Sequence, residues 1–231
     1  SVYHLRSYFA DESQRGVSNR TLHNNRNVFS SFFGWLHTAE LIKKNPCANL
    51  NRIKYTKVVR KPFSPEEIEK LKENSNTRDK AIICLLLSTG CRVSELCRMD
   101  RKDVNFEKRE IVVFGKGSKQ RTVYCDDVAA MLLTRCLDSR NDDREALFIG
   151  KGTPRLQKEG IEKMLREKGE KCNIPNVHPH RFRRTMATGM ISKGMPIQEV
   201  AVLLGHEKIE TTMNYIYIEQ ETVKNNYLRL A

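Results

Sequence analysis

The chain has 231 residues, a size that fits one complete domain together with one small or partial domain. Hydrophobic residues make up 39% and charged residues 30% of it, and no apolar run approaches the roughly 18 residues of a membrane helix, which excludes a protein built on such helices. The opening stretch SVYHLRSYFADESQRG starts with Ser and lacks the layout of a secretory signal peptide. We therefore expect a trimmed start and a cytoplasmic protein.

Charge is the strongest compositional signal. The chain carries 41 Lys and Arg against 28 Asp and Glu, a net charge of +13. Residues 1–60 hold ten of the basic residues and three acids, net +7, which leaves +6 for the rest. A basic excess of this size favours a polyanion as partner, although a solvated basic surface gives the same count.

The seven cysteines form no C-x-x-C pair, and several fall inside apolar helical patterns. Buried free thiols in a reducing cytosol explain them better than a disulfide framework. Cys172, His178 and His180 crowd together, but their irregular spacing and the lack of a fourth ligand argue against zinc. We expect no metal and no cofactor.

The first predicted helix covers residues 18–37, with Ser18 as its N-cap. Five apolar residues share one face of it: Leu22, Phe29, Phe32, Phe33 and Leu36. A basic stretch over residues 51–63 follows and is typical of a linker. We therefore predict a small helical domain over 1–58, the end of the linker over 59–63 and a larger domain over 64–231.

The larger domain begins at Ser64-Pro65-Glu66-Glu67, a capping box with proline at the first helical position. An apolar helix over 79–88 ends at Gly90, and a short helix covers 93–99. Two β-rich runs, 110–114 and 121–124, flank a glycine-containing turn and predict a hairpin. Further helices are predicted over 126–138, 156–170, 180–193, 196–204 and 219–230. The fold class is mainly α with a small antiparallel β-sheet.

Polar residues that interrupt these patterns are candidates for chemistry. Arg92 follows the buried helix, although an ion pair with Glu95 three residues later also explains it. Lys116 lies at the tip of the hairpin, where a solvated lysine is common. Each residue alone is a weak signal.

The C-terminal third adds four more candidates. His180 and Arg183 are three residues apart and share one helical face. His206 follows a glycine at a helix end, where a capping role is the ordinary explanation. Tyr215 comes nine residues later in an amphipathic pattern, where tyrosine usually belongs to a core or an interface.

Taken together, the order R…GKG…HxxR…LGH…Y resembles the tyrosine recombinase (phage integrase) family. The match covers residues 64–231 and includes STGCRVSEL, the Gly-Lys-Gly hairpin, HRFRRTMAT and LLGHEKIETTMNY. Residues 1–58 resemble the family's helical core-binding domain without its first helix. The resemblance also implies a three-stranded sheet, two strands of which are predicted above.

The resemblance implies a site-specific recombinase or integrase, Xer-like or from a mobile element. Such an enzyme breaks and rejoins double-stranded DNA through a 3′-phosphotyrosyl intermediate without metal. Arg92 and Arg183 would bind the scissile phosphate through their planar donor forks, and His206 would donate a further hydrogen bond to it. Glu95 would orient Arg92.

The remaining implied roles concern bond breakage and protons. Tyr215 would be the nucleophile and store the bond energy for rejoining. Lys116 would protonate the leaving 5′-oxygen, and His180 would accept the proton of the tyrosine.

Two positions complicate the family pattern. Arg184 stands where many relatives carry a second histidine, and the three-residue spacing within the HxxR motif selects Arg183. Tyr217 is a second tyrosine, and the nine-residue spacing from His206 selects Tyr215.

Eight basic residues are additional DNA-contact candidates: Arg20, Arg26, Lys54, Lys57, Lys119, Arg121, Arg181 and Arg184. The helix over 219–230 carries one apolar stripe, and the resemblance implies that it docks in trans on a neighbouring copy. The implied assembly is a tetramer on two DNA sites in the bacterial cytoplasm, associated with the nucleoid, with room for accessory DNA-bending proteins.

Two other functions stay open at this point. A type IB topoisomerase-like enzyme would use the same chemistry, and a catalytically silent relative would only bind DNA. The complete set of six candidate residues argues against the silent relative. The sequence reveals neither the target site nor whether the enzyme serves a mobile element or resolves chromosome dimers.

Overall fold

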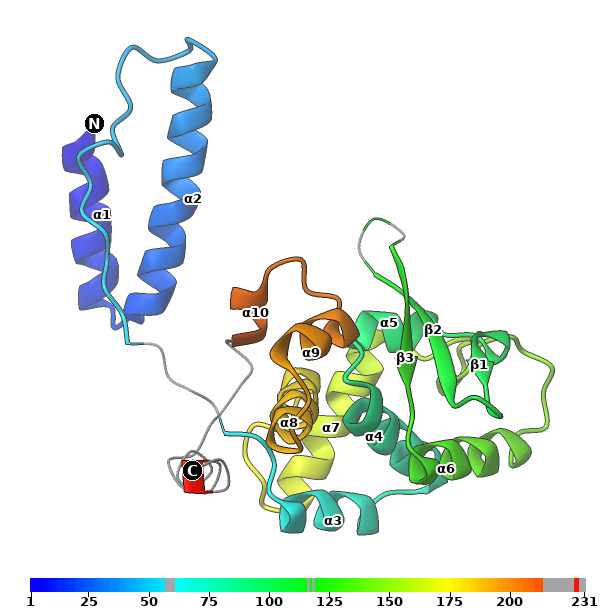
Figure 1. Cartoon of the computed structure of the whole chain (residues 1–231). Coiled ribbons are helices and arrows are strands. Elements are labelled where there is room, and N and C mark those ends of the chain that lie inside the picture. The colour runs from blue at the N-terminus through cyan, green and yellow to red at the C-terminus, as the bar shows by residue number, and fades with distance from the viewer. Residues whose placement is uncertain (57–60, 116, 118, 214–226, 229–231) are drawn as a thin grey trace. The chain divides into compact units, whose positions relative to one another are not determined.

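The computed structural model describes residues 1–56, 61–115, 117, 119–213, 227 and 228 (Figure 1). The chain divides into two compact units, Ser1–Val58 and Val59–Ala231. Lys57, Lys116, Tyr215 and most of the predicted tail helix lie outside the described residues.

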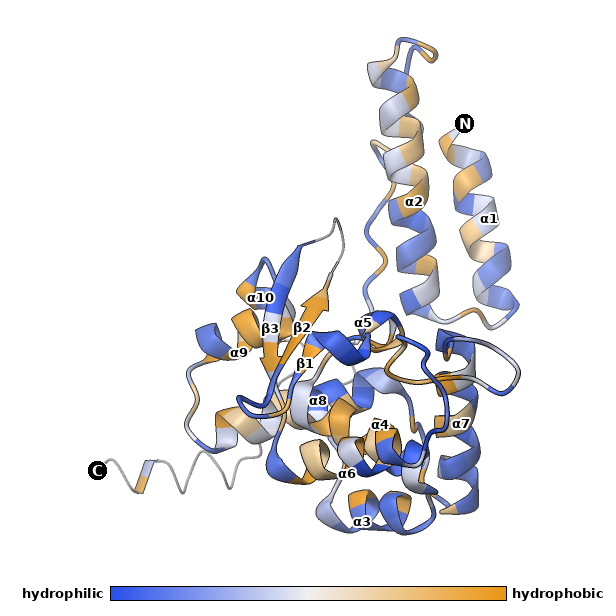
Figure 2. Cartoon of the chain, turned by 90° about the vertical axis from the view of Figure 1, so that its right-hand side faces the viewer, coloured by the Kyte–Doolittle hydropathy of each residue, from blue (hydrophilic) through white to orange (hydrophobic). Residues whose placement is uncertain are grey.

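Helices α1 (Val2–Gln14) and α2 (Asn19–Thr38) form the first unit. The predicted cap of α2 is confirmed, because the Ser18 side chain accepts a hydrogen bond from the backbone of Thr21 at 3.2 Å. Helix α1 was not predicted. Figure 2 shows hydrophobic and hydrophilic residues interspersed along both helices.

The core of this unit is small. Phe9, Leu22 and Leu50 are buried, and Phe29 packs against them. Phe32 belongs to the predicted apolar face of α2 but is 51% exposed, so it lies outside this small core. Helix α1 packs against the part of α2 that carries Leu22 and Phe29.

The second unit carries the remaining elements: α3 (Pro65–Glu73), α4 (Thr77–Thr89), α5 (Val93–Arg98), the 3₁₀ turn η1 (Arg101–Asp103), β1 (Val104–Asn105), β2 (Glu110–Phe114), β3 (Gln120–Tyr124), α6 (Asp127–Asp138), α7 (Lys158–Lys171), α8 (Pro179–Ser192), α9 (Ile197–Leu204) and α10 (Ile209–Met213). The capping box at Ser64 is confirmed, since its side chain accepts from the Glu67 backbone and its own backbone donates to the Glu67 carboxylate. The predicted fold class, mainly α with a small antiparallel sheet, is confirmed.

Helix α4 lies at the centre of the second unit, packed against α6, α8 and α3 (Figure 1). Its apolar run is buried all round, as the sequence predicts. Gly90 ends it with a positive φ of 58°. A Cβ there would come within 3.1–3.3 Å of Met186 and Leu204, so close packing also favours glycine.

The sheet is antiparallel with the order β1-β2-β3. Strand β2 is hydrophobic for most of its length (Figure 2), and Ile111, Val113 and Val123 turn into the core. Strand β1 is only two residues long, too short for an alternating pattern to predict. The sheet brings the β2–β3 hairpin beside α5 and α9.

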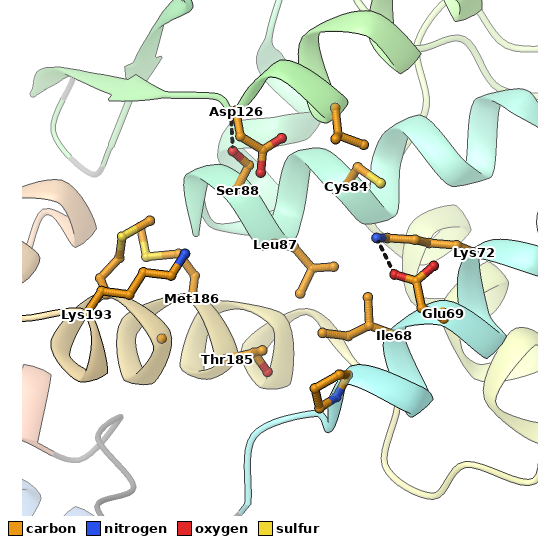
Figure 3. A pocket seen from close by; sticks show the side chains of 14 residues that line it. Ile68, Glu69, Lys72, Cys84, Leu87, Ser88, Asp126, Thr185, Met186 and Lys193 are labelled. Carbon is orange, nitrogen blue, oxygen red and sulfur yellow. Dashed lines mark hydrogen bonds and ion pairs between the residues drawn. The ribbon is translucent and has the colours of Figure 1, made fainter. Parts of the chain in front are cut away.

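A pocket of about 370 Å³ opens between α3, α4 and α8 (Figure 3). Its wall contains the Lys72–Glu69 ion pair and the hydrogen bond from the Asp126 backbone to Ser88. None of the described candidate residues from the sequence lines it. Among the described residues no helix is long and apolar enough to cross a membrane.

Candidate active site

Three chain segments that are far apart in sequence meet at one place in the second unit. Arg92 is the N-cap of α5, Arg183 lies on α8, and His206 follows α9. Arg92 Nη2 donates to the carbonyl of Gly205 at 3.1 Å, and Arg183 Nη2 lies 2.9 Å from His206 Nε2. The structure therefore brings these three predicted site residues into one cluster.

Arg183 is the buried cation of the cluster, with only 2% of the residue exposed. Its Nη1 donates to Gly90 O at 2.6 Å, and its Nη2 donates to Leu204 O. These carbonyls belong to the C-terminal ends of α4 and α9, where helices carry negative partial charge. Two helix ends thus stabilise the guanidinium through their dipoles. These dipoles weaken the attraction of the guanidinium for an anion less than an ionised carboxylate would.

His206 bridges Arg183 and α10. Because a guanidinium can only donate, Arg183 donates to Nε2 of His206, and Nδ1–H of the ring then donates to Thr212 Oγ1 at 2.8 Å. Burial and the nearby Arg183 and Arg92 lower the pKa of His206 to about 4, so the ring is neutral at pH 7. Thr212, fully buried three residues before Tyr215, was not singled out from the sequence.

Glu95 is the buried anion of the site, with 1% of its side chain exposed. It accepts from the Arg92 backbone at 2.7 Å and from Arg92 Nη1 at 2.9 Å, the ion pair that the sequence spacing suggested. Arg121 donates to both oxygens of the same carboxylate, at 2.7 and 2.8 Å. Burial alone would raise the pKa of Glu95, but the hydrogen bonds from Arg121 and Arg92 outweigh it and hold the pKa at about 2.

His180 lies near the start of α8, one turn before Arg183. The residue is exposed as a whole, yet partial desolvation of its ring and the charges of Arg183, Arg184 and Arg92 lower its pKa. A neutral imidazole at pH 7 is able to accept a proton. The cluster and His180 therefore lie in the same positive field.

Lys116 and Tyr215 lie outside the described residues, but chain neighbours of both lie within them. The Gly115 backbone N–H donates to Lys119 O at 2.8 Å, which closes the hairpin beside Lys116. A Cβ at Gly115 would lie 3.7 Å from the Glu95 carboxylate. The base of the hairpin is therefore close to the carboxylate that holds Arg92.

The additional DNA-contact candidates differ in exposure and in whether they have a partner within the protein. Arg20 and Lys54 are exposed. Arg26 donates to Leu50 O at 2.9 Å, Lys119 pairs with Glu207 at 2.5 Å, and Arg184 is half-buried on α8.

Arg121 and Arg181 donate hydrogen bonds to groups inside the protein. Arg121 binds Glu95, and Arg181 pairs with Glu67 at 2.7 Å, lies over the ring of Phe63 and donates to Pro175 O. Arg121 shares the inward face of β3 with Val123, so strand alternation was the signal that could have shown it.

Comparisons of the sequence with known proteins all point to one family. A model of the phage integrase family matches residues 61–222. Tyrosine recombinase XerC of Leptospira interrogans (strain 56601) is 31% identical, covering 96% of this chain and 76% of its own length, and XerC of Bacillus subtilis (strain 168) is 29% identical, covering 96% and 78%.

Solved structures show the same architecture. The crystal structure of XerA recombinase has a TM-score of 0.69 at 25% identity and covers 99% of this chain and 98% of its own. The Tn1549 transposon integrase in complex with circular intermediate DNA has a TM-score of 0.78 at 22% identity and covers 100% and 86%, a likeness of fold.

Proposed function

We propose how the cluster acts on DNA. The premise is that this chain belongs to the phage integrase family and is a tyrosine-type site-specific DNA recombinase. The observation that carries the proposal is the convergence of Arg92, Arg183 and His206 from three separate segments. Phosphoryl transfer needs stabilisation of charge on the non-bridging oxygens, and this cluster concentrates donors for it. The XerC relatives do not favour a topoisomerase-like or catalytically silent protein.

The two arginines bind the scissile phosphate from different depths. Arg92 keeps 37% of its side chain exposed and meets the phosphate at the surface. Arg183 is fixed beneath it by the ends of α4 and α9, so its geometry is set before DNA arrives. A planar, permanently charged fork suits two non-bridging oxygens at once.

His206 changes its partner when the phosphate binds. In the structure its Nε2 accepts from Arg183, so this nitrogen is not yet a donor. A phosphate anion beside the ring raises its pKa and favours a proton on Nε2, which then donates to a phosphate oxygen. The hydrogen bond to Thr212 keeps the ring in place during this change.

Tyr215 makes the new bond and Lys116 and His180 handle the protons. The Tyr215 oxygen attacks phosphorus, the bond to the 5′-oxygen breaks, His180 accepts the phenol proton and Lys116 supplies one to the leaving oxygen. Thr212 supports the nucleophile assignment because it links the segment before Tyr215 to His206. The lowered pKa of His180 keeps its ring unprotonated, as a proton acceptor must be before the reaction.

We propose that double-stranded DNA is the partner, bound by a core-binding domain at residues 1–58 and a catalytic domain at 64–231. The lambda integrase dimer bound to a COC′ core site and XerH recombinase bound to difH substrate, which share this fold, are relatives seen with DNA. Arg20 and Lys54 are exposed and suited to phosphate contacts in the first unit.

We propose the assembly that the resemblance to the family implies. Four copies act on two DNA sites, the tail over 219–230 docks in trans, and the reaction takes place on bacterial DNA in the cytoplasm. The free cysteines within the described residues support a reducing compartment.

A trapping experiment with DNA of random sequence tests the proposal. The protein is mixed with duplexes that carry a nick beside the cleavage position. Cleavage then releases a short fragment with a free 5′-hydroxyl, which diffuses away, so the strand cannot be rejoined and the covalent adduct accumulates. We expect DNA-linked protein whose DNA ends share one sequence. Tyr215→Phe should abolish the adduct and the matched Tyr217→Phe should retain it; the reverse pattern would overturn the assignment.

A further inference from the structure

Arg121 on β3 contacts two of the three segments that carry the described cluster, α5 and the end of α9. Its Nη1 and Nη2 donate to the two oxygens of Glu95 at 2.7 and 2.8 Å, and its Nε donates to Leu203 O at 2.9 Å. Glu95 in turn holds Arg92, and Leu203 lies near the end of α9, just before His206. One side chain therefore links the hairpin, α5 and α9.

The side chain is enclosed, with only 14% of it exposed. The chain at Gly205 passes directly over it, because a Cβ at this glycine would lie 3.0–3.1 Å from three atoms of Arg121. Gly205 also has a φ of 62°, which favours glycine. An arginine covered in this way is poorly placed to reach a DNA backbone.

The charges explain why a second arginine is needed. Each oxygen of Glu95 accepts one hydrogen bond from Arg92 and one from Arg121. One negative charge is shared between two positive charges, so Arg92 keeps part of its charge for an external anion. If Arg121 were neutral, the buried carboxylate would have Arg92 as its main counter-ion and would draw it away from the phosphate.

We propose that Arg121 is a positioning residue for DNA cleavage: it fixes Arg92 through Glu95 and fixes the approach of α9 to His206 through Leu203. The inference rests on the proposed function, because it presumes that Arg92 and His206 bind the scissile phosphate. It predicts a loss in the chemical step rather than in DNA binding.

Single-turnover cleavage and DNA affinity separate this role from a DNA contact. With the DNA recovered by trapping, Arg121→Gln should slow cleavage at saturating DNA by about tenfold to a hundredfold, the scale of a misplaced catalytic group. The dissociation constant and its salt dependence should stay at parent values. A direct phosphate contact would instead weaken binding and reduce the salt slope by about 1, which would overturn the proposal.

Two comparison variants sharpen the test. Arg121→Lys keeps the charge but not the two-pronged geometry, so it should recover part of the cleavage rate. Arg109→Gln is the matched control, since it also removes an arginine–carboxylate pair next to the sheet, with Asp127, but on the exposed surface. It should cleave at the parent rate.

A double variant controls for the possibility that Arg121→Gln unfolds the protein by leaving the buried carboxylate of Glu95 with one arginine fewer. Glu95→Gln with Arg121→Gln removes the ion pair from both sides, leaves no unpaired buried carboxylate, and should slow cleavage by less than the product of the two single effects. Independent effects, or parent-level cleavage by Arg121→Gln, would refute the positioning role. If the parent itself forms no adduct with any duplex, the proposed function fails instead.

Discussion

The two ends of the site hold their arginines with different partners. At the buried end, Arg183 is bound by the carbonyls of Gly90 and Leu204, which are dipoles without net charge. At the outer end, Arg92 is bound by Glu95, which is ionised and shared with Arg121. A carboxylate cancels more of a cation's charge than carbonyl dipoles do, so the buried end should contribute more to phosphate stabilisation and the outer end more to orientation.

The largest expected effect is at the buried end. Arg183→Ala should slow single-turnover cleavage on the order of 10²–10³-fold, the loss typical of a removed charge-stabilising donor. It should also lower the free energy of unfolding, because two buried carbonyls lose their donor. Arg184→Ala is the comparison variant; if it slows cleavage more than Arg183→Ala, the spacing argument for Arg183 is wrong.

The outer end should give a smaller loss. Glu95→Gln keeps the shape of the side chain but removes the charge that orients Arg92, so cleavage should slow by about tenfold, with DNA affinity unchanged. Single-turnover rates and equilibrium binding measure the two quantities. A loss as large as that of Arg183→Ala would remove the distinction between the ends.

A substitution at Gly90, whose carbonyl binds Arg183 at the buried end, should have a smaller effect. Gly90→Ala forces alanine to a φ of 58° and against Met186 and Leu204, and we expect about 1–3 kcal/mol of lost stability. Gly152→Ala is the matched control, since Gly152 also has a positive φ, 75°, but open space around the added methyl group. Urea unfolding of both variants measures the difference; equal losses would show that contact with Met186 and Leu204 adds nothing.

The smallest effect is a pH dependence of stability. The pKa of His206 is about 4 in the folded chain, against about 6.5 when unfolded. The unfolded chain therefore binds a proton first as pH falls, so stability from a neutral His206 is present above about pH 6.5 and is lost between there and about pH 4. The free energy of unfolding, measured across this range, should depend less steeply on pH in His206→Gln than in the parent; an unchanged slope would argue against a half-buried neutral ring.

Local chemistry explains which features the sequence could predict. The capping box at Ser64 and the glycine end of α4 depend on neighbours in the chain, and both are confirmed. The fold class follows from the same kind of local pattern. Motif spacing brought together Arg92, Arg183 and His206, which the structure places in one cluster.

Features that depend on distant partners could not be predicted. The contact of Arg121 with Glu95 could not be predicted, because the two residues lie 26 positions apart in the sequence. Phe32 belongs to the predicted apolar face of α2 but is exposed, because a helical stripe does not show how much of it another helix will cover. The link from His206 to Thr212 is short in sequence, yet the neighbouring motif drew attention to Tyr215 instead.

In the proposed mechanism, Arg183 stabilises negative charge on the scissile phosphate. The most direct measurement is single-turnover cleavage of two substrates by the parent and by Arg183→Ala, one with a normal phosphate and one with a neutral methylphosphonate at the scissile position. We expect a loss on the order of 10²–10³-fold on the phosphate and a much smaller loss on the methylphosphonate, which carries no charge to stabilise. Equal losses on both substrates would contradict it.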